Sequence, residues 1–225
     1  MKLLQLNTLT KEFADTLKSS FDNLLETSHK DGKYRLRRYS VVELRATFWT
    51  WNPITLPTYR ATQVEITRLP TRPFKQSEKL NSHQGGMSRL FDEIDEDALQ
   101  SKGMKEACLI FMQANNLSSG AEVEIHQMRV RTLPDTAWTH VAPEGIHQDG
   151  FDYIATLGIN RHNIHGGELM VYRDKNFAPF MTYRLRDGEM VMLKDRELWH
   201  NATRISRQDE DEEGHGDWFV FCANK

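Results

Sequence analysis

The chain has 225 residues, of which 39% are hydrophobic and 27% are charged, and this composition fits one large domain with a buried core. Its apolar stretches are far shorter than the ~20 residues that a membrane-spanning helix needs, and its net charge of −3 gives no general attraction to nucleic acid or to an anionic membrane. Residues 1–7 lack the long apolar core of a secretory signal, so we expect a cytoplasmic protein.

The first half of the chain mixes predicted helices and strands. The expected elements are an amphipathic helix at 9–26, strands at 34–50 and 62–68 with a loop at 53–60 between them, an irregular segment at 68–86, a helix from Ser88 to Leu99 and a helix at about 104–116. Cys108 in the last helix and Cys222 near the end of the chain are expected to be buried, reduced thiols, because disulfides are rare in a reducing compartment.

Basic and aromatic residues alternate in the run KYRLRRY at residues 33–39. Such a run could contact nucleic acid. A strand with one solvated face, or arginines turned toward an anionic substrate, explains it more simply, so we expect no nucleic-acid partner.

From residue 121 onward the sequence predicts strand after strand. The expected strands are 121–132, 151–160, 167–173, 180–186, 189–194, 198–205 and 217–222, several of them separated by glycine-containing turns. Helices followed by clustered strands predict a mainly β fold with flanking α-helices, built as an antiparallel sandwich or open barrel. We expect a single domain over 1–225, with helical support over about 1–30 and a barrel core over about 121–223.

The sequence His147-Gln148-Asp149 places an imidazole and a carboxylate two residues apart. On an extended segment the side chains alternate, so both point to the same face and can bind one divalent ion. A second histidine from another strand would complete the two-histidine, one-carboxylate triad that leaves positions open on iron. His200, on a later predicted strand, is the candidate third ligand.

The His-x-Asp pattern is not specific by itself, because it also occurs at 29–31 and 215–217. The first of these pairs lies at the end of a predicted helix, and the second has no histidine after it. Only the 147–149 pair has predicted strands on both sides and a later histidine on a separate strand. Spacing alone still leaves ordinary surface or core histidines as the alternative.

Six segments carry a further combined pattern. They are RRY at 37–39, QSEKLN at 76–81, GGMSRLF at 85–91, EIHQMR at 124–129, EGIHQDGFD at 144–152 and GINRHNIHGGE at 158–168. Together they resemble, over about residues 33–222, the bacterial 2-oxoglutarate/Fe(II) dioxygenase family that includes L-isoleucine 4-hydroxylase and related free amino acid hydroxylases.

The resemblance implies a double-stranded β-helix (jelly roll, cupin-like) core. It also implies that His147, Asp149 and His200 hold Fe(II) at one open end of this core. The expected cosubstrates are 2-oxoglutarate and O2, and the expected reaction is hydroxylation of a small molecule, a free aliphatic amino acid or a similar zwitterion.

One position departs from that family. Relatives usually carry Gly-His-Arg-Asp at the start of the last strand, where the arginine is expected to bind the distal carboxylate of 2-oxoglutarate, whereas this chain has Gly-His-Gly-Asp at 214–217. A fixed cation is needed there, because a guanidinium pairs with a carboxylate in a bidentate, oriented way. Arg161, Arg204 and Arg207 are the candidate replacements, and a surface position is the simpler alternative for each.

Gln127, Arg129 and Arg131 alternate along the predicted strand that precedes the metal motif, so they share one face. If that face lines the barrel interior, Gln127 and Arg129 are the candidate substrate-binding residues, with Arg129 the first choice for a carboxylate. A solvated sheet edge is the alternative.

The function that these observations favour is that of an Fe(II)/2-oxoglutarate-dependent hydroxylase of a small molecule. Two other classes remain open on the sequence. One is a jelly-roll metalloenzyme that does not use 2-oxoglutarate, which the missing arginine favours, and the other is a non-catalytic small-molecule-binding protein on the same fold.

Overall fold

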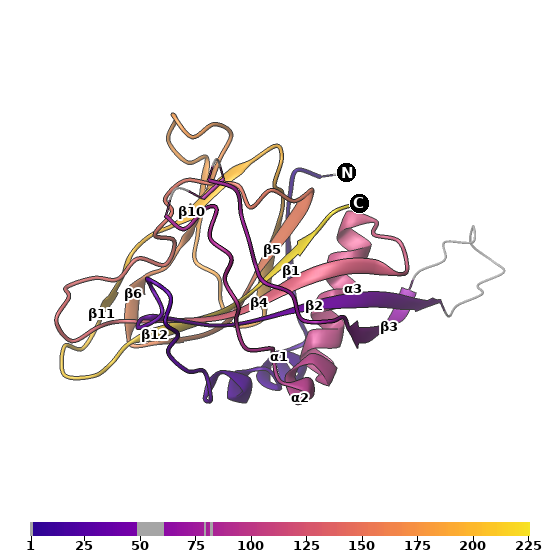
Figure 1. Cartoon of the computed structure of the whole chain (residues 1–225), viewed down its shortest axis with the longest axis horizontal. Helices are drawn as coiled ribbons and strands as arrows, with labels where there is room; N and C mark the ends of the chain where they lie inside the picture. The colour runs from indigo at the N-terminus through magenta and orange to yellow at the C-terminus, as the bar shows by residue number, and fades with distance from the viewer. Residues whose placement is uncertain (1, 49–60, 79, 82) are drawn as a thin grey trace.

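The structure, a computed structural model, describes residues 2–48, 61–78, 80–81 and 83–225. Its strands form one seven-stranded sheet and two smaller sheets, all with antiparallel pairing (Figure 1). The large sheet has the order β1 (Leu4–Thr8), β9 (Glu189–Lys194), β5 (Tyr153–His162), β12 (His215–Ala223), β4 (Ala121–Arg131), β2 (Arg35–Phe48) and β3 (Ala61–Arg68). The smaller sheets are β10 (Trp199–Ala202), β7 (Leu169–Tyr172) and β8 (Met181–Tyr183), and β11 (Ile205–Arg207) with β6 (Ile164–Gly166).

The small sheets and one further segment form a layer opposite the centre of the large sheet. Thr139 and His147 form isolated bridges to Ile205 and His200, so residues 139–147 extend this layer beside β10 and β11. The order across the layer is then 139–147, β10–β11, β6–β7 and β8, opposite β4, β12, β5 and β9. Two antiparallel layers with these connections form a double-stranded β-helix, or jelly roll. This confirms the expected fold, although β1, β2 and β3 also join the large sheet, which therefore extends beyond residues 121–223.

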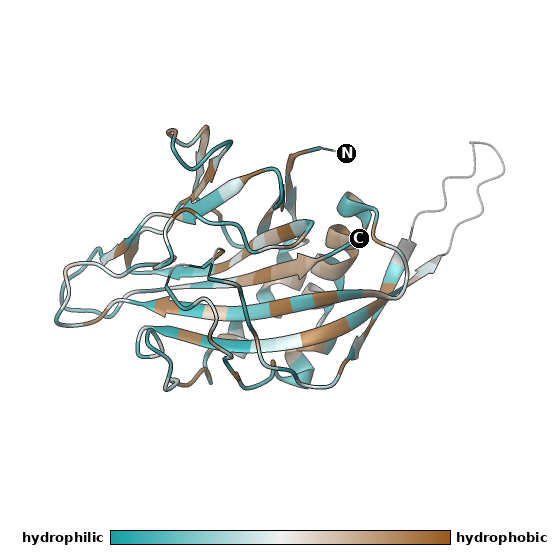
Figure 2. Cartoon of the chain, turned by 45° about the horizontal axis from the view of Figure 1, so that its top comes forward, coloured by the Kyte–Doolittle hydropathy of each residue, from teal (hydrophilic) through white to brown (hydrophobic). Residues whose placement is uncertain are grey.

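The central strand β12 separates two apolar cores. Trp218 and Cys222 belong to the core between the two layers, whereas Phe219 and Phe221 belong to the core between the large sheet and the helices. This division follows from the strand period, since successive side chains point to opposite faces. Figure 2 shows the corresponding change between hydrophobic and hydrophilic residues along the long strands.

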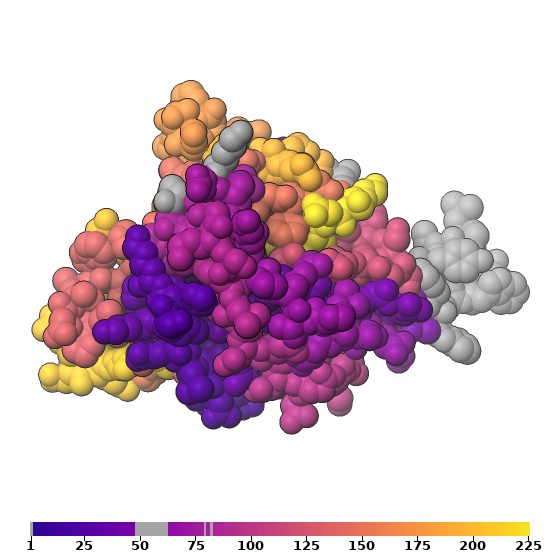
Figure 3. All heavy atoms as spheres, viewed as in Figure 1, coloured from indigo at the N-terminus to yellow at the C-terminus, as the bar shows by residue number. Residues whose placement is uncertain are grey.

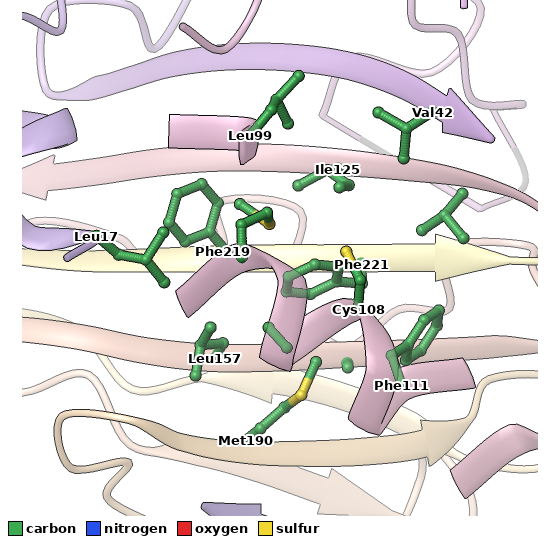
Figure 4. Packing of buried hydrophobic residues seen from close by; sticks show 14 of the residues in the cluster. Leu17, Val42, Leu99, Cys108, Phe111, Ile125, Leu157, Met190, Phe219 and Phe221 are labelled. Atoms are coloured by element: carbon green, nitrogen blue, oxygen red, sulfur yellow. The ribbon is translucent and has the colours of Figure 1, made fainter. Parts of the chain in front are cut away.

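The helices are short except for one, which covers the outer face of the large sheet. They are α1 (Lys11–Asp15), the 3-10 helix η1 (Lys18–Phe21), α2 (Glu96–Gln100) and α3 (Lys102–Asn115). The hydroxyl of Ser101 caps α3 by accepting from the backbone N–H of Met104, and α3 packs Cys108 and Phe111 against the sheet (Figure 4). Each such buried side chain contributes about 1.5–3 kcal/mol. The expected helix at 104–116 is confirmed, and no helix in the described part of the chain is long and apolar enough to cross a membrane.

The single helix expected at 9–26 was wrong. The structure has two short pieces there, α1 and η1, of which α1 ends at Asp15. The hydroxyls of Thr16 and Ser20 donate to the carbonyls of Phe13 and Leu17, three residues earlier. Such local bonds compete with a continuous helix.

The helix expected from Ser88 to Leu99 was also wrong over most of its length, because α2 begins only at Glu96. The preceding backbone bonds to β2 instead. The N–H of Tyr39 donates to the carbonyl of Asp92, and the N–H of Ile94 donates to the hydroxyl of Ser40. Pairing with a neighbouring strand therefore replaces helix formation in this segment.

The strands agree with expectation more closely, with three differences. β1 and β6 were not expected, and the single strand expected at 198–205 is divided into β10 and β11. The division lies where Gly166 approaches the backbone of Arg204 so closely that a side chain at residue 166 would collide with the Arg204 carbonyl. The loop expected at 53–60 lies outside the described residues.

Candidate active site

Two backbone hydrogen bonds join distant parts of the chain at the candidate site. The N–H of His147 donates to the carbonyl of His200 at 3.0 Å, and the N–H of His200 donates to the carbonyl of His147 at 2.9 Å. The two imidazole rings are consequently 4.2 Å apart between their centroids. The carboxylate of Asp149 lies beside both rings, with oxygens 3.7 Å from Nε2 of His147 and 3.4 Å from Nε2 of His200.

These three side chains fit a divalent metal ion. One donor atom from each lies within 4.8 Å of the other two, which is close enough for all three to bind one ion. Two imidazoles and one carboxylate are the donor set of non-heme Fe(II) oxygenases. In the described part of the chain no lysine or arginine forms an ion pair with Asp149, so its negative charge is available to a cation.

Neighbouring groups orient two of the three side chains. Nδ1 of His147 lies 2.8 Å from the carbonyl oxygen of Gly145, which leaves Nε2 facing Asp149. The side-chain amide of Gln76 donates to Oδ1 of Asp149 at 3.0 Å. Such partners fix the direction of a ligand and are as much a part of a metal site as the ligands themselves.

The buried carboxylate of Asp195 holds the turn that follows Asp149. It accepts hydrogen bonds from the backbone N–H groups of Asp149, Gly150 and Phe151 at 3.1, 2.7 and 3.1 Å. One of its oxygens is also 3.7 Å from Nδ1 of His200. Asp195 therefore links the two parts of the chain that carry the triad.

The charges within the triad oppose the cost of burial. Burial disfavours the ionised carboxyl of Asp149, but the hydrogen bond from His200 and the charges of His200 and His147 lower its pKa well below the usual range. Burial, and then the proximity of His200, lowers the pKa of His147. Burial also opposes protonation of His200, but its hydrogen bond to Asp149 and the charge of Asp149 raise the pKa of His200. An ionised carboxylate and a neutral imidazole are the forms that bind a metal.

The triad opens into a cavity whose lining is charged in one part and apolar in another. Three arginines, which we call the arginine wall, line the first part. They are Arg35 and Arg37 of β2 and Arg89 of the segment between β3 and α2. Figure 3 shows this segment, in purple to magenta, at the molecular surface. The apolar part includes Leu169, Leu185, Trp218, Val220 and Cys222.

The members of the arginine wall differ in their partners. Arg35 is buried between the carboxylates of Asp31 and Glu144, at 3.2 and 3.4 Å. Arg37 and Arg89 have no carboxylate partner among the described residues. Nη2 of Arg37 contacts the sulfur of Met128 at 3.6 Å, and Arg89, which is 2% exposed, reaches the amide oxygens of Gln84 and Gln76 at 3.4 and 3.5 Å.

Burial and mutual repulsion act on these two cations. Burial, followed by the positive charges of Arg35 and Arg89, lowers the pKa of Arg37 to about 9. Burial, followed by Arg35, also lowers the pKa of Arg89. Arginine side chains stay charged in proteins, so both guanidinium groups add positive charge to the cavity, and the charges of Asp31 and Glu144 oppose it only in part, without a direct ion pair.

The position of the missing arginine is occupied by an aromatic ring. A Cβ atom built at Gly216 would lie no more than 2.8 Å from three ring atoms of Trp218, so the indole covers the place from which the family arginine would extend. Arg161 of β5 lies directly opposite Gly216 in the sheet. Nη2 of Arg161 donates to the carbonyl of Gly166, whereas Nη1 is buried with no hydrogen-bond partner among the described residues.

None of the three candidate arginines is a lining residue of the cavity, although Arg161 lies beside the lining residue Gly167. The other two lie farther along the chain. The exposed guanidinium of Arg204 lies 3.6 Å from the centroid of the Trp138 ring, and Arg207 donates to the carbonyl of Pro134 at 3.3 Å. Both follow β10 after the chain has turned at residues 203–204, so their nearness to His200 in sequence does not bring them to the triad.

Gln127 and Arg129 lie on the opposite face of the large sheet from the cavity. The amide of Gln127 donates to the hydroxyl of Ser20 at 2.8 Å, and Arg129 forms a bidentate pair with Asp217 at 2.6 and 2.8 Å. Their neighbours His126 and Met128 line the cavity instead. The alternation of the strand was correct, and the face that Gln127 and Arg129 share is not the cavity face. The condition on which their substrate-binding role depended is therefore not met.

Sequence reasoning did not assign roles to the arginine wall or to Gln76. Arg37, Gln76 and Arg89 lie in segments that carry the family resemblance, RRY at 37–39, QSEKLN at 76–81 and GGMSRLF at 85–91, whereas Arg35 lies just before the first of them. The alternation of Arg35 and Arg37 along one strand was the available signal, and it was interpreted only as arginines that could face an anionic substrate.

Comparisons with known proteins agree with this geometry. A sequence model of the 2OG-Fe dioxygenase family matches residues 18–222, whereas no curated protein sequence matches the chain. Solved structures share the fold, and three of them have the following similarity to this chain. A BsmA homologue from Methylobium petroleophilum PM1 has a TM-score of 0.71 at 22% identity, covering 98% of this chain and 88% of that one. IDO from Bacillus thuringiensis has a TM-score of 0.69 at 14% identity, covering 98% of this chain and 94% of that one. The Fe(II)/α-ketoglutarate-dependent dioxygenase TqaL has a TM-score of 0.68 at 14% identity, covering 100% of this chain and 83% of that one.

Proposed function

The chain belongs to the 2OG-Fe dioxygenase family and is a 2-oxoglutarate-dependent dioxygenase that uses Fe(II) and O2, and we propose that it hydroxylates a free aliphatic amino acid, as L-isoleucine 4-hydroxylase does. The observation that carries the proposal is the convergence of His147, Asp149 and His200 at the edge of a cavity with a positively charged lining. The family match favours 2-oxoglutarate chemistry over the two alternatives that the sequence left open.

In this proposal His147, Asp149 and His200 hold the iron. The bound metal supplies the oxidising chemistry, in which 2-oxoglutarate gives succinate and carbon dioxide while a C–H bond of the substrate becomes C–OH. The chain itself supplies orientation. Gly145 and Gln76 set the directions of His147 and Asp149, and Asp195 holds the turn between them and β5. The buried cavity lining excludes water from the reacting groups.

We also propose that Arg161 binds the distal carboxylate of 2-oxoglutarate in place of the missing arginine. Arg161 is the direct cross-strand neighbour of Gly216, so its side chain lies on the same face of the sheet. Its Nη1 would lie 3.1 Å from a Cβ atom built at Gly167, and Gly167 lines the cavity. A buried guanidinium nitrogen without a partner at the cavity edge is suited to an incoming carboxylate.

The free amino acid as substrate is supported by the sequence resemblance and by the charge of the cavity. An amino acid presents a carboxylate, which the guanidinium groups of the arginine wall can bind. The apolar lining, including Leu169 and Leu185, suits an aliphatic side chain.

Oxygen-dependent succinate formation over a panel of aliphatic amino acids tests the function. We expect one or more amino acids to stimulate succinate formation and to gain one oxygen atom by mass spectrometry. The His147→Ala variant should lose both signals. If succinate forms at the same rate with every amino acid and no product gains oxygen, the proposed substrate class is wrong.

A further inference from the structure

The arginine wall contains three cations, of which only Arg35 contacts carboxylates directly. Arg35 is paired with both Asp31 and Glu144. These two carboxylates also act on Arg37 and Arg89 without forming ion pairs with them, so three cations share two anions. Arg37 and Arg89 line the same cavity without a carboxylate partner among the described residues. Burying a cation is costly unless an anion accompanies it. A ligand anion bound between Arg37 and Arg89 would supply the missing partner.

Both side chains are also held in place. Arg89 lies over the ring of Phe74 at 4.8 Å and is 2% exposed, and Arg37 lies 5.4 Å from the centroid of Phe91. Guanidinium groups fixed in this way lose little freedom when they bind, and two of them can orient a planar carboxylate. The arrangement therefore differs from that of exposed arginines, whose side chains are free to move.

A short chain of contacts relates these cations to the metal-binding triad. Nη2 of Arg89 is 3.5 Å from the amide oxygen of Gln76, and the amide nitrogen of Gln76 is 3.0 Å from Oδ1 of Asp149. An anion at Arg89 is thus separated from the Asp149 carboxylate by one side chain. The remainder of the bound molecule would then lie beside the triad, where a C–H bond must be presented.

His126 adds a polar atom to the same part of the cavity. Its ring packs against those of Tyr39 and Phe74, with centroid distances of 4.8 and 4.6 Å. Its Nδ1 is buried with no hydrogen-bond partner among the described residues. A buried imidazole nitrogen without a partner is rare in a folded protein unless a ligand supplies one.

We propose that Arg37 and Arg89 form the binding site for the carboxylate of the substrate, so that the enzyme requires a substrate with a free carboxylate. The inference rests on the proposed function and assigns its substrate recognition to residues distinct from Arg161, which serves the cosubstrate. Two carboxylates, one from each molecule, then occupy separate cationic sites in one cavity.

Acid and amide forms of the same compounds test the requirement without any substitution. The probes are L-leucine, L-isoleucine and L-methionine and their carboxamides, which keep the side chain and remove the negative charge. We expect calorimetry on the metal-free protein to show binding of at least one acid and about 10- to 100-fold weaker binding of its amide, the range for losing a charge-assisted hydrogen bond. Equal affinity for an acid and its amide, or no measurable binding of either form, would overturn the proposal.

Variants then assign the site to these residues. In Arg37→Met and Arg89→Met the affinity for the acid should fall about 10- to 100-fold, and in Arg37→Lys by less, because charge is kept but bidentate geometry is lost. Arg45→Met, which removes an exposed arginine from the same strand, is the matched control and should bind normally. The circular dichroism spectrum identifies any variant that fails to fold. If a methionine variant is unfolded, the affinity of Arg37→Lys for the acid and the acid–amide comparison on the wild-type protein still decide whether the arginine wall binds the carboxylate.

The cosubstrate is measured separately, from the visible band of the ferrous 2-oxoglutarate chelate under anaerobic conditions. We expect Arg37→Met to keep its affinity for 2-oxoglutarate. If Arg37→Met instead loses 2-oxoglutarate and keeps the amino acid, the arginine wall holds the cosubstrate and the inference is wrong. Failure of the wild-type protein to form the chelate would count against the proposed function alone, because acid binding to the metal-free protein is an independent signal.

Discussion

Gly216 on β12 lies directly opposite Arg161 on β5, on the same face of the large sheet. Directly opposed residues have Cβ atoms about 4.5–5.5 Å apart, a distance that the length of an arginine side chain can span. The loss of a guanidinium at one position can therefore be compensated from the neighbouring strand. The indole of Trp218 covers the vacated position, and Nη1 of Arg161 remains without a partner among the described residues.

The first prediction concerns Arg161 itself. Arg161→Met should raise the dissociation constant of 2-oxoglutarate about 10- to 100-fold, because it removes a charge-assisted bidentate pair. Anaerobic titration of the ferrous protein measures this constant. Iron affinity and amino acid affinity should change little. Unchanged 2-oxoglutarate affinity in a folded variant would show that another group binds the distal carboxylate.

The second prediction restores the family residue at position 216. Gly216→Arg should destabilise the protein by about 1–3 kcal/mol, since the new side chain overlaps the ring of Trp218. Trp218→Ala removes a buried ring and should itself cost about 3–5 kcal/mol, so the overlap predicts that the double variant loses less stability than the sum of the two single variants, which chemical denaturation can measure. In the Arg161→Met background, Gly216→Arg with Trp218→Ala should also recover part of the 2-oxoglutarate affinity. Strict additivity of the two single losses in the double variant would contradict the overlap.

Two residues of the metal triad could be predicted from local spacing, and the third from the fold that the resemblance implied. The spacing of His147 and Asp149 puts both on one face, and a jelly roll returns His200 beside them. The face of β4 could not be predicted, because Gln127 and His126 satisfy the strand pattern equally well in either orientation. Only the packing of Ser20 and the helices against one side of the sheet decides it.

The arginine wall escaped assignment for a related reason. Arg89 forms a β-bridge with Phe74, and the backbone shortly after it, at Asp92, bonds to β2. Arg89 therefore does not lie in the helix that its sequence predicted. Tertiary contacts override the local propensity there. The position of a side chain in an irregular segment depends on such contacts, which single-sequence periodicity does not report.

The third prediction concerns acid stability. Burial opposes ionisation of Asp31 and Glu144, but Arg35 is the main group that holds both carboxylates ionised, and the pKa of each is lowered to about 2. Carboxyl groups in an unfolded chain titrate near pH 4. Because the pKa is lower in the folded state, each ionised carboxyl stabilises the folded protein above about pH 4. This stabilisation is lost as the pH falls from about 4 to about 2. Each carboxyl contributes about 2–3 kcal/mol to the free energy of unfolding at neutral pH. The two contributions are not independent, because both depend on the charge of Arg35.

Urea unfolding at a series of pH values measures this effect. The wild-type free energy of unfolding should fall steeply below about pH 4. Asp31→Asn should be less stable at neutral pH and should show a shallower loss in acid, because one of the two linked carboxyls is absent. A slope that is the same in the variant and the wild type would exclude Asp31 as a source of the acid sensitivity.

The last prediction separates orientation of the metal ligand from its identity. The amide of Gln76 donates to Oδ1 of Asp149 and its oxygen lies near Arg89, so Gln76 is a positioning residue between the metal site and the arginine wall. Gln76→Leu should keep all three ligands yet lower the affinity for Fe(II) about 10- to 100-fold, the range for losing a partner of a metal ligand. Gln76→Glu keeps the shape but places a second carboxylate beside Asp149, which should raise the pKa of the pair and make metal binding depend more strongly on pH. Competition with a chelator at several pH values measures both effects. If Gln76→Leu binds Fe(II) as tightly as the wild type, the hydrogen bond to Asp149 does not contribute to holding the metal.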